Sequence, residues 1–149
     1  MEIEELRQLV KTGTLTNINL EGMELDSIDF SGCTLSQVSF KKSTLTNCRF
    51  RNATLQWCDM RYIHIDGATF EDAKIDFCDF YRAFVDGVVI FNGSKISNCS
   101  LNKAYFGDSA LIRKQNLVGH RILQQSAKDY RRFLTEWHKF GTGTRTNDV

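Results

Sequence analysis

The chain carries at residues 45–60 the sequence LTNCRFRNATLQWCDM, part of a longer stretch from Leu15 to Ile90 in which every fifth residue is apolar. Neither an α-helix, with a period of about 3.6, nor a simple strand, with a period of about 2, produces a strict repeat of five. Such a fixed repeat indicates stacked structural units. The apolar centres are Leu15, Leu20, Leu25, Phe30, Leu35, Phe40, Leu45, Phe50, Leu55, Met60, Ile65, Phe70, Ile75, Phe80, Val85 and Ile90, followed after one extra residue by Ile96, Leu101, Phe106 and Leu111.

A second, usually smaller residue lies two places before most of these centres. A unit of five residues can form one short extended side and one corner, so four units close a square coil of about 20 residues. Successive coils stack like parallel strands about 4.8 Å apart, with centres and smaller residues pointing inward and the other three positions facing water. The smaller inward residues are Ile28, Cys33, Val38, Ser43, Cys48, Ala53, Cys58, Ala68, Ala73, Cys78, Ala83 and Val88.

The position two residues after the centre supports the presence of corners independently. Gly or Asn often occupies it, and these residue types best tolerate the left-handed backbone angles found in turns. We place the one extra residue of the repeat in a bulged corner at residues 91–95. The Gly and Asn corners are Asn17, Gly22, Gly32, Asn47, Asn52, Gly67, Gly87, Asn92 and Asn98.

These units resemble the pentapeptide-repeat family, in which a small residue, a polar residue, Leu or Phe and two polar positions follow one another. Ala53-Thr54-Leu55, Ala68-Thr69-Phe70 and Cys78-Asp79-Phe80 fit that pattern well. The resemblance covers residues 13–111 and implies an all-β solenoid, a right-handed quadrilateral β-helix of about five coils. Such a scaffold hosts unrelated activities, so the function needs separate evidence.

The two ends of the chain do not follow the repeat. Residues 1–12 have the pattern of a short amphipathic helix, which we expect to cap the open first coil. Residues 112–140 predict a C-terminal amphipathic basic helix, and residues 141–149 predict a flexible polar tail. Residues 1–111 hold 11 Lys and Arg against 15 Asp and Glu, whereas residues 112–149 hold 8 against 3. A basic helix beside an acidic coil favours capping or a homodimer through this helix over nucleic-acid binding.

The five cysteines all occupy the small inward position of the repeat, and no CxxC or Cys/His pair is present. Buried thiols behave as small hydrophobic groups, which makes a structural role the favoured interpretation. Cys58 and Cys78 lie one coil apart and could approach each other. An odd number of core thiols is typical of a reducing compartment, so we expect a cytoplasmic location.

No apolar run is long enough to span a bilayer, and the acidic N-terminus lacks a signal-peptide core.

The coil period places several exposed aromatic and basic residues in columns. Trp and Tyr in exposed columns are unusual, and with Arg they dominate binding hot spots. We therefore predict a partner-binding surface, although the predicted C-terminal helix could instead cover Trp57 and Phe77 with its own Trp137. An acidic column of Asp26, Asp66 and Asp86 and the pair Glu71 and Asp72 lie on other corners. The predicted partner-binding residues are Lys41, Lys42, Trp57, Arg61, Tyr62, Phe77, Tyr81 and Arg82.

The sequence gives little support for catalysis. His64 is predicted to point outward near Asp66, and His120 and His138 fall in the predicted C-terminal helix. The chain has no phosphate-binding glycine loop, nucleophile elbow or zinc-ligand spacing, and a filled rod offers no pocket. We therefore expect no catalytic residue, no cofactor and no metal.

Three functions remain open. The first is a non-catalytic bacterial protein that occludes or anchors an acidic partner, for example an immunity protein that neutralises a toxin. The second is implied by the resemblance: some family members mimic DNA and protect type II topoisomerases from quinolones. A DNA mimic must present phosphate-like charge along its length, which a net charge of +1 does not favour. The third is nucleic-acid binding by the basic helix, which a near-neutral isoelectric point disfavours.

Overall fold

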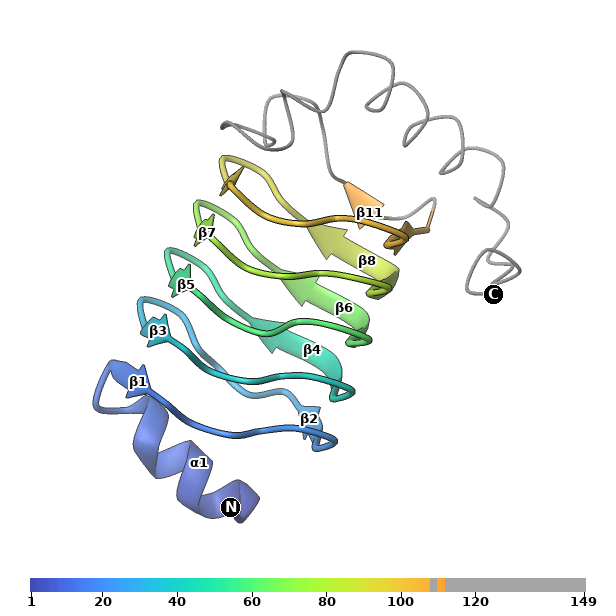
Figure 1. Ribbon diagram of the computed structural model, residues 1–149. Coiled ribbons are helices and arrows are strands. Elements are labelled where there is room, and N and C mark those ends of the chain that lie inside the picture. The colour runs from blue at the N-terminus through green and yellow to red at the C-terminus, as the bar shows by residue number, and fades with distance from the viewer. Residues whose placement is uncertain (108–109, 112–149) are drawn as a thin grey trace.

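The computed structural model describes residues 1–107 and 110–111 as a parallel β-solenoid of about five turns, preceded by one short helix (Figure 1). The solenoid predicted from the five-residue period is therefore confirmed. The predicted C-terminal helix of residues 112–140 and the predicted tail of residues 141–149 lie outside the described residues. Within the described part, no helix has the length and apolar character needed to cross a membrane.

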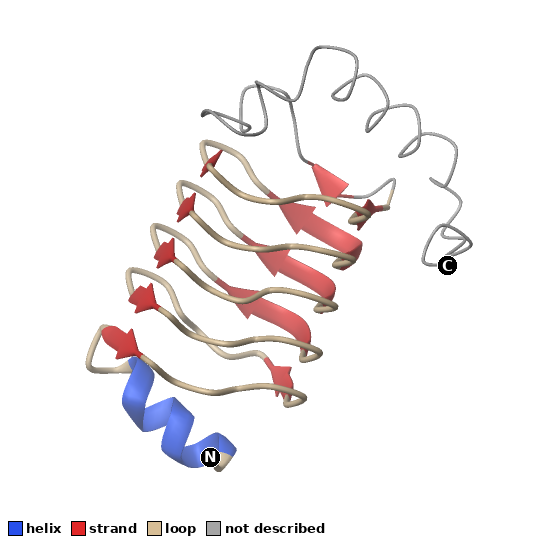
Figure 2. Ribbon diagram, viewed as in Figure 1, coloured by secondary structure: helices blue, strands red, loops and turns tan. Residues whose placement is uncertain are grey.

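The N-terminal helix α1 (Ile3–Val10) lies against the first coil, as Figure 2 shows. A capping box fixes its start: the Glu2 side chain accepts from the backbone of Glu5, whose own side chain accepts from the backbone N–H of Glu2 at 3.3 Å. Leu6 is fully buried, and Ile3, Leu9 and Val10 pack on the core. The predicted helix of residues 1–12 is confirmed with slightly shorter bounds, and its apolar face covers the open end of the solenoid.

The strands fall into two parallel sheets. In both, residues 20 positions apart are paired in the early coils, as Leu15 with Leu35 and Leu45 with Ile65, so each coil lies directly over the one before it. In the last coils the paired residues are 21 positions apart, as Ile75 with Ile96. One sheet contains β1 (Thr14–Thr16), β3 (Thr34–Ser36), β5 (Thr54–Gln56), β7 (Lys74–Asp76) and β9 (Lys95–Ser97). The other contains β2 (Glu24–Asp26), β4 (Thr44–Arg49), β6 (His64–Thr69), β8 (Phe84–Ile90) and β10 (Tyr105–Phe106), with β11 (Ala110–Leu111) beside β8.

Isolated parallel bridges complete the sides of the coil. One column joins Asn19, Ser39, Asp59, Asp79 and Ser100, and another pair joins Asp29 to Arg49. The two halves of the longer strands β4, β6 and β8 belong to different sides, because each strand bends at a corner residue such as Asn47. Pairing therefore occurs along four separate sides, as expected for a quadrilateral coil. The right-handed sense of the coil stays a prediction.

The inside of the solenoid is a continuous column of apolar side chains. Rings on one side stack from coil to coil, with centroid distances of 4.8 Å between Phe30 and Phe50, 4.7 Å between Phe50 and Phe70, and 5.1 Å between Phe70 and Phe91. All five cysteines are buried in the smaller inward position and are free thiols. Their predicted placement in the core is confirmed.

The extra residue of the repeat lies earlier than the sequence predicted. Asp66 pairs with Asp86, but Ala68 pairs with Val89, so the insertion falls at residues 87–88 rather than 91–95. Val88 is consequently 62% exposed, and Val89 and Phe91 occupy the inward positions predicted for Val88 and Ile90. This register puts the Phe91 ring on the Phe70 stack, which buries more apolar surface than Ile90 would. The corner predicted at Asn92 moves to Gly93, whose φ is 71°.

Candidate interaction surface

The corner residues divide the four corners of the solenoid into two kinds. Each corner residue has a left-handed backbone, with φ between 53° and 79°. Two corners hold only short residues or glycine, namely Ser27, Asn47, Gly67 and Gly87 on one and Gly32, Asn52, Asp72 and Gly93 on the next. The other two hold long side chains: Gln37, Trp57 and Phe77 on one, and Lys42, Tyr62, Arg82 and Lys103 on the next.

Long side chains are unfavourable in this conformation. The left-handed region brings Cβ close to the following carbonyl oxygen, which costs a residue other than Gly or Asn roughly 1–2 kcal/mol. Bulky residues there are outliers, and such outliers cluster at functional sites. The two corners with long side chains bound the same side of the solenoid, because the column Ser39, Asp59 and Asp79 runs between them. We call this side, with both of its corners, the Asp59 side.

The aromatic corner of the Asp59 side is formed by Gln37, Trp57 and Phe77. The Trp57 and Phe77 rings are stacked, with centroids 4.3 Å apart and planes 7° from parallel. Trp57 remains 59% exposed and Phe77 42% exposed. Because the rings cover each other and stay partly exposed, they form one apolar ridge on this corner. The alternative that residues near Trp137 cover this ridge concerns a segment outside the described residues.

The basic corner holds the six other predicted site residues, Lys41, Lys42, Arg61, Tyr62, Tyr81 and Arg82. Tyr62 and Tyr81 meet edge to face with centroids 5.8 Å apart. The Arg82 guanidinium lies 5.5 Å from the Tyr81 ring centroid, and its Nε donates to the Tyr81 hydroxyl at 3.2 Å. Tyr62 is 44% exposed and Lys42 is exposed, whereas the others are half-buried. These contacts hold the tyrosines in fixed positions beside the cations.

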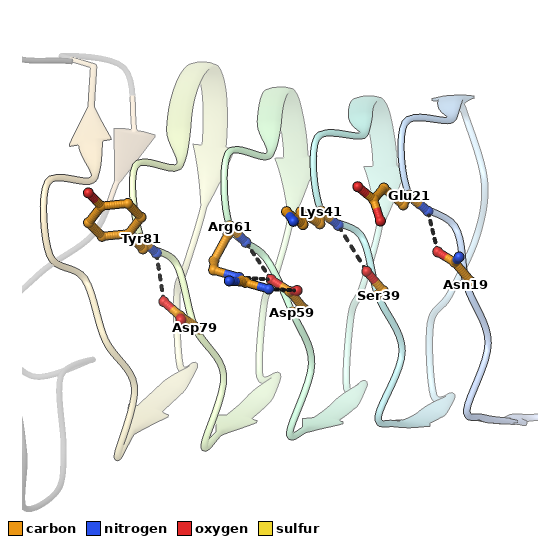
Figure 3. A network of polar contacts seen from close by, with 8 residues as sticks. All are labelled: Asn19, Glu21, Ser39, Lys41, Asp59, Arg61, Asp79 and Tyr81. Atoms are coloured by element: carbon orange, nitrogen blue, oxygen red, sulfur yellow. Dashed lines mark hydrogen bonds and ion pairs between the residues drawn. The ribbon is translucent and has the colours of Figure 1, made fainter. Parts of the chain in front are cut away.

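A ladder of side-chain caps lies between the two corners (Figure 3). In four consecutive coils a short polar side chain accepts a hydrogen bond from the backbone N–H two residues later, which is the geometry of an Asx-type turn. The distances are 2.9 Å from Glu21 N to Asn19, 3.4 Å from Lys41 N to Ser39, 3.1 Å from Arg61 N to Asp59 and 2.9 Å from Tyr81 N to Asp79. The ladder fixes how the chain enters the basic corner.

Asp59 also binds the side chain of Arg61. The guanidinium donates from Nε at 2.8 Å and from a terminal nitrogen at 2.7 Å to the two carboxylate oxygens (Figure 3). These hydrogen bonds hold the pKa of Asp59 below its ordinary value, and they raise the pKa of Arg61. The corner is therefore less positive than the sequence indicated, because one of its cations already has a carboxylate partner.

Sequence reasoning missed Asp59 and Asp79 as members of this surface. It grouped residues 20 apart into columns, but Asp59 and Arg61 lie before and after the same centre, Met60, and meet at one corner. The spacing Asp-x-Arg around a buried centre was the available signal. The structure brings all eight predicted residues onto one side, and whether they bind a partner stays a prediction.

Other polar residues of the described chain make local contacts. His64 is half-buried with its ring 5.2 Å from the Phe84 ring, and Glu71 pairs with Arg51 at 3.5 Å instead of standing open. The expected acidic column is present, with Thr46 between Asp26 and Asp66. Across residues 1–107 and 110–111, no three His, Cys, Asp or Glu side chains are placed to hold a metal ion.

A parallel β-solenoid built from five-residue units with an inward centre defines a class of repeat protein, and comparison with known proteins identifies the family. Two models of pentapeptide repeats match the chain, one with nine copies over residues 20–64 and one with eight copies over residues 48–87. Residues 20–87 of the chain therefore consist of pentapeptide repeats. A comparison with curated proteins found no match.

Solved structures include a similar solenoid. A pentapeptide repeat protein from the thylakoid lumen of Arabidopsis thaliana is 24% identical, with a TM-score of 0.66 over 73% of this chain and 75% of that chain. A pentapeptide repeat protein from the cyanobacterium Cyanothece 51142 is 15% identical, with a TM-score of 0.32 over 78% of this chain and 98% of that chain. At 24% identity, the likeness to the Arabidopsis protein supports the fold alone.

Proposed function

We propose that this protein is a non-catalytic binding module that occludes or anchors one protein partner through the Asp59 side. An immunity protein that neutralises a bacterial toxin is a concrete example of such a module. The observation that carries the proposal is the placement of Trp57, Phe77, Tyr62 and Arg82 at left-handed corners. The fold is served better by Gly or Asn at these positions, so a contribution other than folding accounts for the long side chains.

The chemistry of this side suits a protein partner with acidic groups. Trp, Tyr and Arg are the residues that most often dominate binding energy, and the contacts among them reduce the entropy lost on binding. Within the described residues, Lys41 and Lys42 form no ion pair, whereas Asp59 is matched by Arg61. Carboxylates of a partner would meet these lysines on the basic corner, across the Asp59 side from the aromatic ridge. The five buried free thiols support a reducing, cytoplasmic location for the complex.

A DNA mimic that protects a type II topoisomerase is the second candidate, favoured by the acidic column of Asp26, Asp66 and Asp86. Thr46 interrupts this column, and the neighbouring corner carries Lys42 and Arg82. Phosphate-like charge along the whole rod is what mimicry requires, so the charge distribution supports the first function over this one. A supercoiling assay with gyrase and a quinolone distinguishes them, because only a mimic protects the enzyme.

The experiment for the first function is affinity capture from the native host with three forms of the chain. The wild type is expected to capture a partner, and Arg61→Ala combined with Tyr81→Ala is expected to lose it. The control is Arg51→Ala combined with Glu71→Ala, which removes an exposed ion pair on another corner and should leave capture intact. Far-UV circular dichroism checks that each variant folds. Undiminished capture by the Arg61 and Tyr81 variant would overturn the proposal.

A further inference from the structure

We propose that two copies of this chain associate through their Asp59 sides, with the aromatic corner of each copy against the basic corner of the other. Self-association would cover the surface until the protein partner competes for it. The inference concerns the same side as the proposed function. It rests on how the two corners of that side complement each other across a two-fold axis, and it can be tested without any partner protein.

The first argument is the concentration of exposed apolar surface. Among the described residues, five large hydrophobic side chains are exposed: Met1, Trp57, Tyr62, Phe77 and Val88. Three of them belong to the Asp59 side, and an aromatic side chain buries roughly 150–250 Å² when it is covered. Apolar groups gathered on one side of a soluble protein mark an association surface.

The second argument is symmetry. A closed dimer needs a surface that complements itself across a two-fold axis. If the axis runs parallel to the solenoid, the aromatic corner of one copy faces the basic corner of the other. If the axis lies across the solenoid, cations face cations and repel. The charge distribution therefore selects the parallel arrangement.

The third argument is that the residues of the two corners lie at nearly the same height along the solenoid axis. Each basic-corner residue follows its aromatic-corner counterpart by five residues, a quarter of a coil, which is a rise of only about 1.2 Å when coils are about 4.8 Å apart. Trp57 of one copy then lies opposite Tyr62 of the second copy, and Phe77 lies opposite Arg82. An aromatic pair and a cation–π pair result, and the two-fold axis repeats both.

The acidic residues between the two corners limit how tightly the two copies can associate. Asp59 and Asp79 each face their own counterpart across the axis, and like charges oppose contact. Arg61 offsets Asp59 through its two hydrogen bonds, whereas the Asp79 carboxylate accepts only the Tyr81 N–H among the hydrogen bonds of the described residues. We therefore expect a weak, concentration-dependent dimer, and we expect Asp79→Asn to strengthen it, since Asn can still accept that N–H.

The test is sedimentation equilibrium of the full chain over a range of concentrations. The wild type should show a reversible monomer–dimer equilibrium, and Trp57→Asn with Phe77→Asn should weaken it by about tenfold or more, since Asn fits the left-handed corner. Asp79→Asn should strengthen it about two- to fivefold. The matched control is Val88→Asn, which removes an exposed apolar side chain from a different corner and should change nothing.

Two outcomes would overturn the inference. One is a wild type that stays monomeric at every concentration reached. The other is a dimer that the Trp57 and Phe77 double variant leaves intact, which would place the contact elsewhere, for example in residues 112–149. Either outcome is separate from loss of partner capture, because a monomer can still bind a different protein through the Asp59 side.

Discussion

At single corner residues, the side chains proposed to bind a partner conflict with the backbone conformation that the fold requires. A left-handed φ is inexpensive for Gly67 but unfavourable for Lys42, Trp57 and Tyr62, which have φ values of 56° to 58°. The same backbone is formed in all coils because the inward centres and the stacked sheets fix it. The core therefore supports side chains that the corners alone would not select.

A stability measurement at position 42 tests this view. Lys42→Asn should raise the free energy of unfolding by about 0.5–1 kcal/mol, because Asn adopts the left-handed region more easily. Urea unfolding followed by circular dichroism measures the change. The matched control is Lys95→Asn in strand β9, an exposed site with an extended backbone, where no gain is expected. Equal gains at both sites would contradict the role of the corner conformation.

Among the strands, the solenoid accommodates one extra residue where β8 pairs with the shorter β6. Strand β8 has seven residues and its neighbour β6 has six, and the difference is absorbed at residues 87–88. The sequence could not locate this insertion, because Val88 with Ile90 and Val89 with Phe91 are both apolar pairs two residues apart. Ring stacking on Phe70 decides between them, and a one-dimensional period does not contain that information.

Deleting Val88 tests the assignment of the insertion. The deletion should leave a regular 20-residue coil, with Gly87 as the corner and Val89 following it as Ala68 follows Gly67. We expect the variant to keep the far-UV spectrum and to melt close to the wild-type temperature. Deletion of Asn47, a corner of a regular coil, should instead move Phe50 out of the core, which costs about 3–5 kcal/mol or more. Similar melting of the two deletion variants would refute the register.

For the whole molecule, the period of five and the coil of about 20 residues predicted the architecture, the core and the columns of the candidate surface. The charge state of that surface could not be predicted in the same way. The pairing of Asp59 with Arg61 depends on the bend of one corner, and the period describes only which residues stack. Because the core is continuous, titration of its buried thiols is also linked to unfolding of the whole solenoid.

Alkaline pH gives a test of this linkage. Burial raises the pKa of the Cys33 and Cys48 thiols above the ordinary value. Their protonated form is thus favoured more by the folded chain than by the unfolded chain. The resulting stability is present below the unfolded pKa, about 8.5, and is lost as pH rises through the folded pKa. Folded stability should therefore decline above about pH 8.5, measured by urea unfolding at a series of pH values.

Comparing the wild type with a variant that lacks one buried thiol separates the effect of thiol titration from that of Tyr and Lys titration. Cys48→Ala removes one buried thiol but keeps a small inward residue like Ala68, its neighbour in the next coil. The variant should be less stable at neutral pH, yet its stability should fall less steeply at alkaline pH than that of the wild type. Parallel pH profiles for the two proteins would mean that the thiols do not link alkaline titration to unfolding. A shallower profile would show that the core of the solenoid discriminates between a thiol and a thiolate.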